Sequence, residues 1–137
     1  MKTIATKSVG VGILYILCLI IGIILTILGF STTYILIIAI PIVGVSLYIV
    51  IDYFKTPSTP MMLNDLNELL LPKGVVIKLN EIKDVSYRRA SARGIQYKWG
   101  TVKIISLKGT FKYRYLNDCE RVCKTITKLM YEGKKIE

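Results

Sequence analysis

A single uncharged stretch, from Ser8 to Ile51, limits how this chain can fold, because it contains no aspartate, glutamate, lysine or arginine. A water-soluble domain cannot bury so much uninterrupted apolar chain in a protein of 137 residues, whereas a lipid bilayer can. A helix needs about 20 apolar residues to cross a hydrocarbon core about 30 Å thick. The stretch is therefore long enough for two crossings and too long for one.

Two helices are expected within this stretch. Its locally polar break is the sequence Gly-Phe-Ser-Thr-Thr at 29–33, so we place the first span at about 9–30 and the second at about 34–53. Backbone N–H and C=O groups must be hydrogen-bonded in lipid, and a helix forms these hydrogen bonds within itself. We assign residues 1–56 to this transmembrane hairpin.

The charges that flank the two spans predict their orientation. Lys2 and Lys7 precede the first span, Lys55 follows the second, and the connecting loop is uncharged. Because cytoplasmic loops carry the excess of lysine and arginine, both termini are expected in the cytoplasm. The first apolar stretch is too long for the core of a cleaved signal peptide, and a second span follows directly. The chain is therefore expected to be a multi-pass protein of the cell membrane.

The composition after the spans indicates a separate basic domain, residues 57–137. The sequence Thr-Pro-Ser-Thr-Pro at 56–60 is typical of a linker. In the next segment, 61–71, the leucines recur at helical spacing, which predicts a short amphipathic helix, with an edge strand as the alternative. Alternation with a period of two then predicts antiparallel strands and a tight turn at 107–110. The predicted strands are 75–87, 95–99, 102–107 and 111–115.

The last predicted element is an amphipathic helix. Asn117 and Glu120 have the spacing of a capping box, and an apolar stripe follows them. This helix is expected to cover the sheet and to bury the strand aromatics Trp99 and Tyr113 beneath it. The predicted fold class is α+β: a two-helix transmembrane hairpin followed by a small antiparallel β-sheet domain that the C-terminal helix closes.

The domain contains the segments Ile77–Tyr87, Gly100–Ile104 and Gly109–Phe111, with two short membrane helices before them and a helix after them. In these segments and their order, the chain resembles the bacterial pleckstrin-homology-like (PH-like) membrane proteins. The resemblance covers about 73–131 and implies a sheet of about seven strands capped by a helix. The sequence itself predicts four or five strands, so the early strands are expected to be shortened or replaced by 61–71, which would leave the PH-like sheet incomplete.

The residue types argue against an enzyme. The chain has no histidine, no Gly-rich phosphate loop and no cluster of residues with metal-ligand spacing. Cys119 and Cys123 lie four apart on the predicted helix, where two buried apolar thiols are a better explanation than a zinc site. We therefore predict no catalysis, no metal and no cofactor.

The net charge of +10 is the more informative feature. Arg88, Arg89 and Arg93 crowd one connection between strands and are the candidate residues for binding anionic lipid headgroups or an acidic partner. A solvated basic face is the alternative. Nucleic acid is disfavoured as a partner, because the aromatic residues that would stack on bases are assigned to the core.

These observations favour a membrane-anchored, non-enzymatic binding or scaffold module whose basic domain contacts anionic headgroups or another membrane protein at the cytoplasmic face. Two alternatives stay open. One is an immunity or resistance factor against a membrane-active peptide, a role that some proteins resembling this family have. The other is an accessory subunit of a membrane transport complex. The binding module requires the fewest further assumptions.

Overall fold

The computed structural model describes residues 1–134, which form two compact units. One unit is Val9–Lys55, and the other combines Met1–Ser8 with the chain from Thr56 onward. The first eight residues therefore group with the later domain and not with the hairpin, to which the sequence analysis assigned them. The second unit is called the β domain below.

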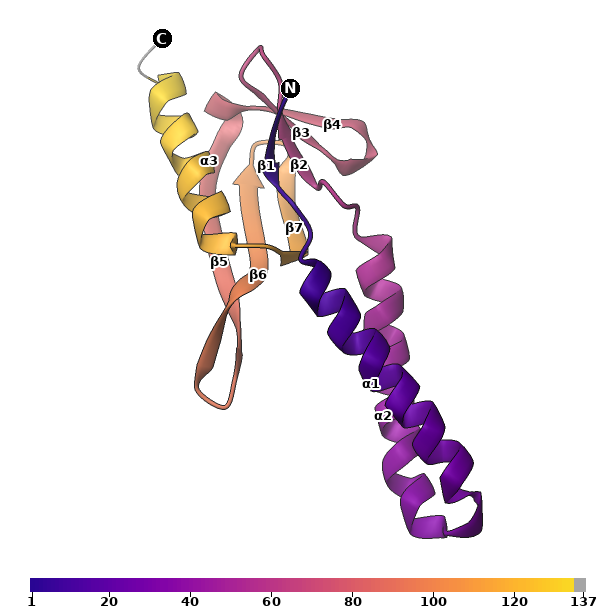
Figure 1. Ribbon diagram of the computed structural model, residues 1–137. Coiled ribbons are helices and arrows are strands. Elements are labelled where there is room, and N and C mark those ends of the chain that lie inside the picture. The colour runs from indigo at the N-terminus through magenta and orange to yellow at the C-terminus, as the bar shows by residue number, and fades with distance from the viewer. Residues whose placement is uncertain (135–137) are drawn as a thin grey trace. The chain divides into compact units, whose positions relative to one another are not determined.

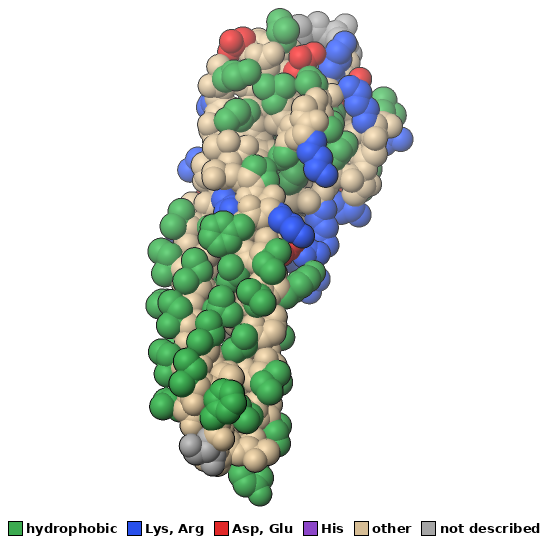
Figure 2. Space-filling view, turned by 90° about the vertical axis from the view of Figure 1, so that its right-hand side faces the viewer, with side chains coloured by type: hydrophobic (Ala, Val, Ile, Leu, Met, Phe, Trp, Pro, Cys, Tyr) green, Lys and Arg blue, Asp and Glu red, His purple; other side chains and the backbone are tan. Residues whose placement is uncertain are grey.

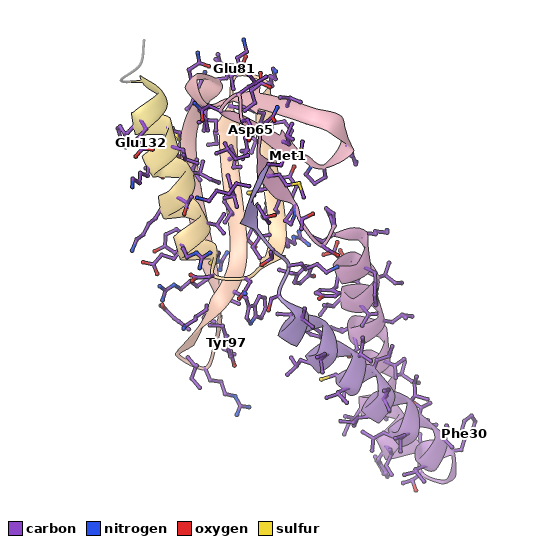
Figure 3. The ribbon with its side chains drawn as sticks, turned by 45° about the horizontal axis from the view of Figure 1, so that its top comes forward. Met1, Phe30, Asp65, Glu81, Tyr97 and Glu132 are labelled. Carbon is purple, nitrogen blue, oxygen red and sulfur yellow. The ribbon has the colours of Figure 1, made fainter. Side chains whose placement is uncertain are left out.

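The first unit is a pair of helices, as predicted. Helix α1 (Val9–Leu28) and helix α2 (Thr33–Lys55) are joined by a 3₁₀ turn, Gly29–Ser31, with Phe30 at the tip (Figures 1 and 3). At about 1.5 Å per residue, their 20 and 23 residues span about 30 and 35 Å. Both are long and apolar enough to cross a membrane.

The surface of the helical pair is apolar. Side chains such as Ile13, Ile24 and Leu47 are half exposed, and Figure 2 shows hydrophobic side chains covering the visible face of the two helices. The two helices touch through a small residue, because a Cβ on Gly22 would lie 2.8 Å from Cγ2 of Val43. Contiguous apolar surface of this extent is rare on soluble monomers and is typical of segments covered by lipid or by another protein.

The β domain begins with a four-stranded antiparallel sheet in the order β1-β2-β3-β4. Its strands are β1 (Lys2–Ala5), β2 (Met61–Leu63), β3 (Glu68–Leu71) and β4 (Val75–Lys78). The sequence did not predict β1 at all.

The predicted helix over 61–71 is wrong, and the alternative of an edge strand is right only in that the segment is extended, because it forms two strands, β2 and β3, inside the sheet. The segment is a β-hairpin whose turn is closed by Asn67, which adopts a left-handed φ of 57° and donates its N–H to the Asn64 carbonyl oxygen at 3.1 Å. Leu69 and Leu71 are buried at alternate positions of β3, whereas Leu66 is exposed in the turn. The turn shifts the period-two alternation between the two strands, so the leucines of this segment recur at helical spacing in the sequence.

Strand β1 also reaches the other sheet. Beyond Ala5 the chain bridges to the end of β7 (Gly109–Leu116), where the N–H of Asn117 donates to the carbonyl oxygen of Thr6 at 2.9 Å. The N–H of Ser8 donates to the carbonyl oxygen of Tyr115 at 2.8 Å. The helical pair is therefore an insertion between the first and second strands of the β domain.

The second sheet has three antiparallel strands in the order β5-β6-β7, with β5 spanning Ile82–Ala92 and β6 spanning Ile95–Ser106. The strand predicted at 111–115 is confirmed. The run predicted at 75–87 is two strands of different sheets, β4 and β5, separated by a 3₁₀ turn at Leu79–Glu81, and the strands predicted at 95–99 and 102–107 are one continuous strand, β6. Its partner β7 carries one extra residue opposite Gly100–Val102, where Tyr115 adopts a φ of 59°. A bulge of this kind bends the strand that carries it, here β7, and increases the local twist.

Helix α3 (Cys119–Lys134) closes the β domain, as predicted. Asp118, rather than Asn117, caps it, because the Asp118 carboxylate accepts the N–H of Arg121 at 3.3 Å. Val122 and Ile126 of α3 are buried against the strands of both sheets. The core of the domain thus joins strands β1 to β7 to the helix. It comprises Ala5, Met61, Leu69, Leu71, Ile77, Leu79, Ile82, Val102, Ile104, Leu116, Cys119, Val122, Ile126 and Met130.

The dependence of the β domain on β1 gives a direct test. The N–H of Lys7 lies 3.0 Å from the carbonyl oxygen of Ser58, so a short Gly/Ser linker can join residues 1–8 to 56–137 in place of the helices. We expect this joined variant to be folded and to unfold cooperatively, because it keeps every strand. A 57–137 fragment loses the buried Ala5 and leaves the edge of β2 unpaired, so we expect it to be unfolded or aggregated in circular dichroism melts. Equal melting temperatures for the two proteins would contradict the role of β1.

Candidate functional site

Alternation along β5, β6 and β7 gives the second sheet two chemically different faces. On β6, Val102 and Ile104 are buried towards α3, whereas the intervening Lys103 is exposed on the outer face. The strand register places Lys103 beside Ser86 of β5 and Lys112 of β7, so these three residues form one row across the outer face. The neighbouring row pairs Arg88 with Thr101.

A groove of about 490 Å³ lies along this outer face. Its volume is in the range of small-molecule sites, which is large enough for a lipid headgroup. The outer-face residues that line it come from all three strands of the sheet: Ser86, Arg88, Ala90, Trp99, Thr101, Lys103 and Lys112. We call this feature the basic groove.

The three cations on the outer face of the basic groove, Arg88, Lys103 and Lys112, form no ion pair among the described residues. The sequence has no acidic residue between Asp84 and Asp118, so every residue of β6 and β7 is neutral or basic. The potential in the groove is therefore positive, and an anion would relieve the mutual repulsion of the three cations.

Glycine at position 100 allows β5 and β6 to approach closely beside the groove. A Cβ there would collide with the carbonyl oxygen of Arg88 and would lie 2.9 Å from the Sγ of Cys119. The same residue thus sets the distance between Arg88 and the strand that carries Lys103, and it leaves space for the first residue of α3.

The structure does not bring the three predicted arginines together. Arg88 and its neighbour Arg89 on β5 both line the basic groove, but Arg89 forms an ion pair with Glu120 of α3. Arg93 lies in the turn between β5 and β6, with a φ of 48°. Successive residues of a strand point to opposite faces, so the cluster in the sequence became one outer-face residue of the groove, one groove-lining residue held in an ion pair and one turn residue.

Lys103 and Lys112 are the groove residues that sequence reasoning missed as site residues. Both are cations at outer positions of alternating strands, which was visible in the sequence. Their pairing was not visible, because it depends on the register between β6 and β7 and on the bulge at Tyr115.

The expectation that α3 buries Trp99 is wrong. Inward-facing residues of β6 have even numbers from Gly100 to Ser106, so Trp99 lies on the outer face, half-buried, and stacks between Tyr97 and Tyr115. Tyr113 does pack against the core, and this burial raises the pKa of its phenol. The aromatic residues that we assigned to one core face are therefore divided between the two faces.

The two thiols of α3 are buried, as predicted. Desolvation raises the pKa of both Cys119 and Cys123, and the Cys123 thiol donates to the Val85 carbonyl oxygen at 3.4 Å. Raised pKa values keep the thiols protonated and poorly nucleophilic at neutral pH. These cysteines therefore act as small apolar core residues.

Comparisons with protein-family models, with curated proteins and with solved structures give no match for this chain.

The close approach at Gly100 predicts a specific sensitivity. Gly100→Ala should lower the free energy of unfolding by about 1–3 kcal/mol, the usual cost of overpacking, because the contacts of the new methyl group are mainly with backbone. The measurement is denaturant unfolding of the full chain in neutral detergent, followed by circular dichroism. Ser91→Thr adds a methyl group at an exposed position of the same sheet and serves as the control. Equal stability of the two variants would show that β5 and β6 can separate freely.

Proposed function

We propose that this protein is a membrane-anchored, non-enzymatic binding module of the PH-like class, and that its basic groove contacts anionic lipid headgroups at the cytoplasmic face of the membrane. The observation that carries the proposal is the set of three cations in the groove, Arg88, Lys103 and Lys112, which have no acidic partner among the described residues.

The number and order of the strands support the PH-like assignment. The β domain has seven antiparallel strands in sheets of four and three, followed by one helix. This agrees with the sheet of about seven strands and the capping helix that the sequence resemblance implies. The strands that the sequence left uncounted are β1, β2 and β3, and the first of these precedes the helical pair.

Two further observations support insertion of α1 and α2 in a bilayer. Their lengths match the thickness of a hydrocarbon core, and their outward side chains are apolar.

In addition, β1 precedes α1 and β2 follows α2, yet the two strands pair. Such pairing requires both ends of the helical pair to lie on one side of the membrane. The flanking Lys2, Lys7 and Lys55 favour the cytoplasmic side.

The chemistry of the groove favours binding rather than catalysis. Its lining offers cations, hydroxyl groups and an indole ring, and it includes no carboxylate and no thiol. A planar guanidinium binds phosphate oxygens in pairs, and two ammonium groups add point charges. Each cation held near an anionic surface contributes about 1 kcal/mol, so three together correspond to about a 100-fold gain in affinity.

The native Trp99 lines the groove and is the sole tryptophan of the chain, so it can report on binding. The full chain in a neutral detergent is titrated with short-chain phosphatidylserine and, separately, with short-chain phosphatidylcholine. We expect Trp99 fluorescence to respond to the anionic lipid and the response to weaken with salt, because salt screens exposed charges. The triple variant Arg88→Gln, Lys103→Gln, Lys112→Gln should lose about two orders of magnitude in affinity.

The matched control removes the same charge elsewhere. Lys2, Lys78 and Lys83 are exposed cations outside the groove, and their replacement by glutamine should leave the affinity within about threefold of the parent. A triple groove variant that binds like the parent would refute the groove as the site. A parent protein that ignores anionic lipid would refute headgroup binding and make an acidic partner protein the next hypothesis.

Membrane topology has its own test. In a Cys18→Ser background, Thr32→Cys in the loop between the spans should react with an impermeant maleimide added to intact cells. Lys128→Cys on α3 should react only after the cells are opened, because the β domain is proposed to be cytoplasmic. Labelling of Lys128→Cys in intact cells would overturn the proposed orientation.

A further inference from the structure

Strands β5 and β6 extend past the rest of their sheet. The last pair between β6 and β7 is Gly100 with Leu116, but β5 and β6 continue to pair as far as Ala92 with Ile95. A two-residue turn, Arg93-Gly94, closes this extension, and both residues have positive φ angles, 48° and 83°. We call residues 90–99 the arm, which projects beyond β7 in Figure 1.

The arm begins at the end of the β domain from which the chain leaves for α1 and to which it returns from α2. At that end the N–H of Ser8 donates to the carbonyl oxygen of Tyr115 at 2.8 Å. The Nζ of Lys7 donates to the carbonyl oxygen of Thr56 at 2.8 Å, which ties the departing chain to the returning chain. Tyr115 is next to Leu116, the residue opposite Gly100 at the base of the arm. The base of the arm therefore lies at the same end of the domain as the two points where the chain leaves for α1 and returns from α2.

An aromatic ladder links that end to the arm. The ring of Tyr115 lies 6.4 Å from that of Trp99, and Trp99 lies 6.0 Å from Tyr97, with both pairs stacked at 30°. Tyr115 belongs to β7, whereas Trp99 and Tyr97 lie on the arm, where Figure 3 labels Tyr97. Stacking holds the arm rings on one face and gives the arm a fixed direction relative to Tyr115.

The surface of the arm combines apolar, aromatic and cationic groups. Ile95 is 62% exposed and Tyr97 is 40% exposed, and Arg93 and Lys98 are also exposed. No acidic residue occurs in the arm. Rings with a polar tip, an aliphatic side chain and nearby cations are the composition of protein segments that lie among lipid headgroups, where the rings reach the acyl boundary and the cations remain at the phosphates.

We propose that the arm lies in the headgroup region of the bilayer that α1 and α2 cross, with Ile95, Tyr97 and Trp99 at the boundary of the acyl chains. The inference rests on the proposed membrane insertion of the helical pair, and it does not need the basic groove to bind lipid. Chain continuity keeps Ser8 and Thr56 at the membrane surface, and the base of the arm lies at the same end of the domain as these residues. The arm is then a third point of attachment of the β domain to the bilayer, beside the start of α1 and the end of α2.

Trp99 is the one tryptophan of the chain, so its fluorescence can measure the depth of the arm. The full chain is reconstituted in vesicles that contain phosphatidylcholine brominated either near the headgroup or near the end of the acyl chain. We expect the shallow bromines to quench Trp99 strongly and the deep bromines to quench it less. Acrylamide in the water should quench it several-fold less than it quenches the unfolded chain.

Two variants supply the controls. Leu107 lies in the turn at the other end of β6 and is 67% exposed, so it matches Ile95 in type and exposure but not in place. With Trp99→Phe as background, Leu107→Trp should be quenched by acrylamide and not by bromolipid. In the same background, Ile95→Trp at the tip of the arm should be quenched by the shallow bromolipid at least as strongly as Trp99.

The outcomes separate this inference from the proposed function. Acrylamide quenching of Trp99 and of Ile95→Trp equal to that of Leu107→Trp, with no bromolipid effect, would show that the arm lies in water, and the inference would be wrong. If alkaline carbonate releases the chain from the vesicles, the helical pair is not inserted and both proposals fall. If the groove variants lose anionic lipid while bromolipid quenching persists, the arm and the groove act independently and the inference stands.

Discussion

Main-chain hydrogen bonds of the first eight residues hold the β domain together, and the other features depend on them. Strand β1 pairs with β2 on one side, and the residues that follow it bond to the end of β7 on the other, so one short segment joins the two sheets. The same bonds bring Lys7 next to Ser58 and thereby close the loop that contains both long helices. The helical unit Val9–Lys55 thus leaves and rejoins the β domain at one place, and it does not interrupt the core of that domain.

The charges of the second sheet are divided between structure and surface. On the inner side, Arg89 pairs with Glu120, and at the turn after β6 Lys108 lies 3.4 Å from Glu81 and donates to the carbonyl oxygen of Val76. These cations connect the sheet to its neighbours, and each exposed pair contributes at most about 1 kcal/mol to stability. On the outer side, Arg88, Lys103 and Lys112 have no such role among the described contacts. Because these three cations repel one another and form no ion pair that offsets the repulsion, a bound anion would lower their electrostatic energy.

The sequence contained most of the local structure and little of the pairing. The two long helices, the terminal helix and the extended character of the chain from Val75 to Leu116 were predictable, because hydrophobic periodicity is a local property of the chain. The break between β4 and β5 was not predicted. Strand β1 was not predictable, because four residues before a long apolar helix carry no pattern until a partner more than fifty positions away is known. Leucine spacing in 61–71 misled because a turn shifted the phase of two short strands. In the site, Arg88 was identified because three arginines cluster in one segment of the sequence. The roles of Lys103 and Lys112 and the outward position of Trp99 could not be predicted, because they require the register of three strands. That register depends on Gly100 and on the bulge at Tyr115.

The insertion of the helical pair after β1 also affects the order of biosynthesis. A ribosome makes residues 1–8 before both long helices, and only afterwards the strands with which this segment pairs. Until β2 and β7 have emerged, β1 has no partner and its few residues cannot form a stable sheet alone. The β domain can therefore complete its core only when both helices have been synthesised. If the helical pair is inserted in a bilayer as proposed, a chain whose second helix failed to insert would leave β1 separated from the rest of its sheet, and folding of the β domain would depend on correct insertion.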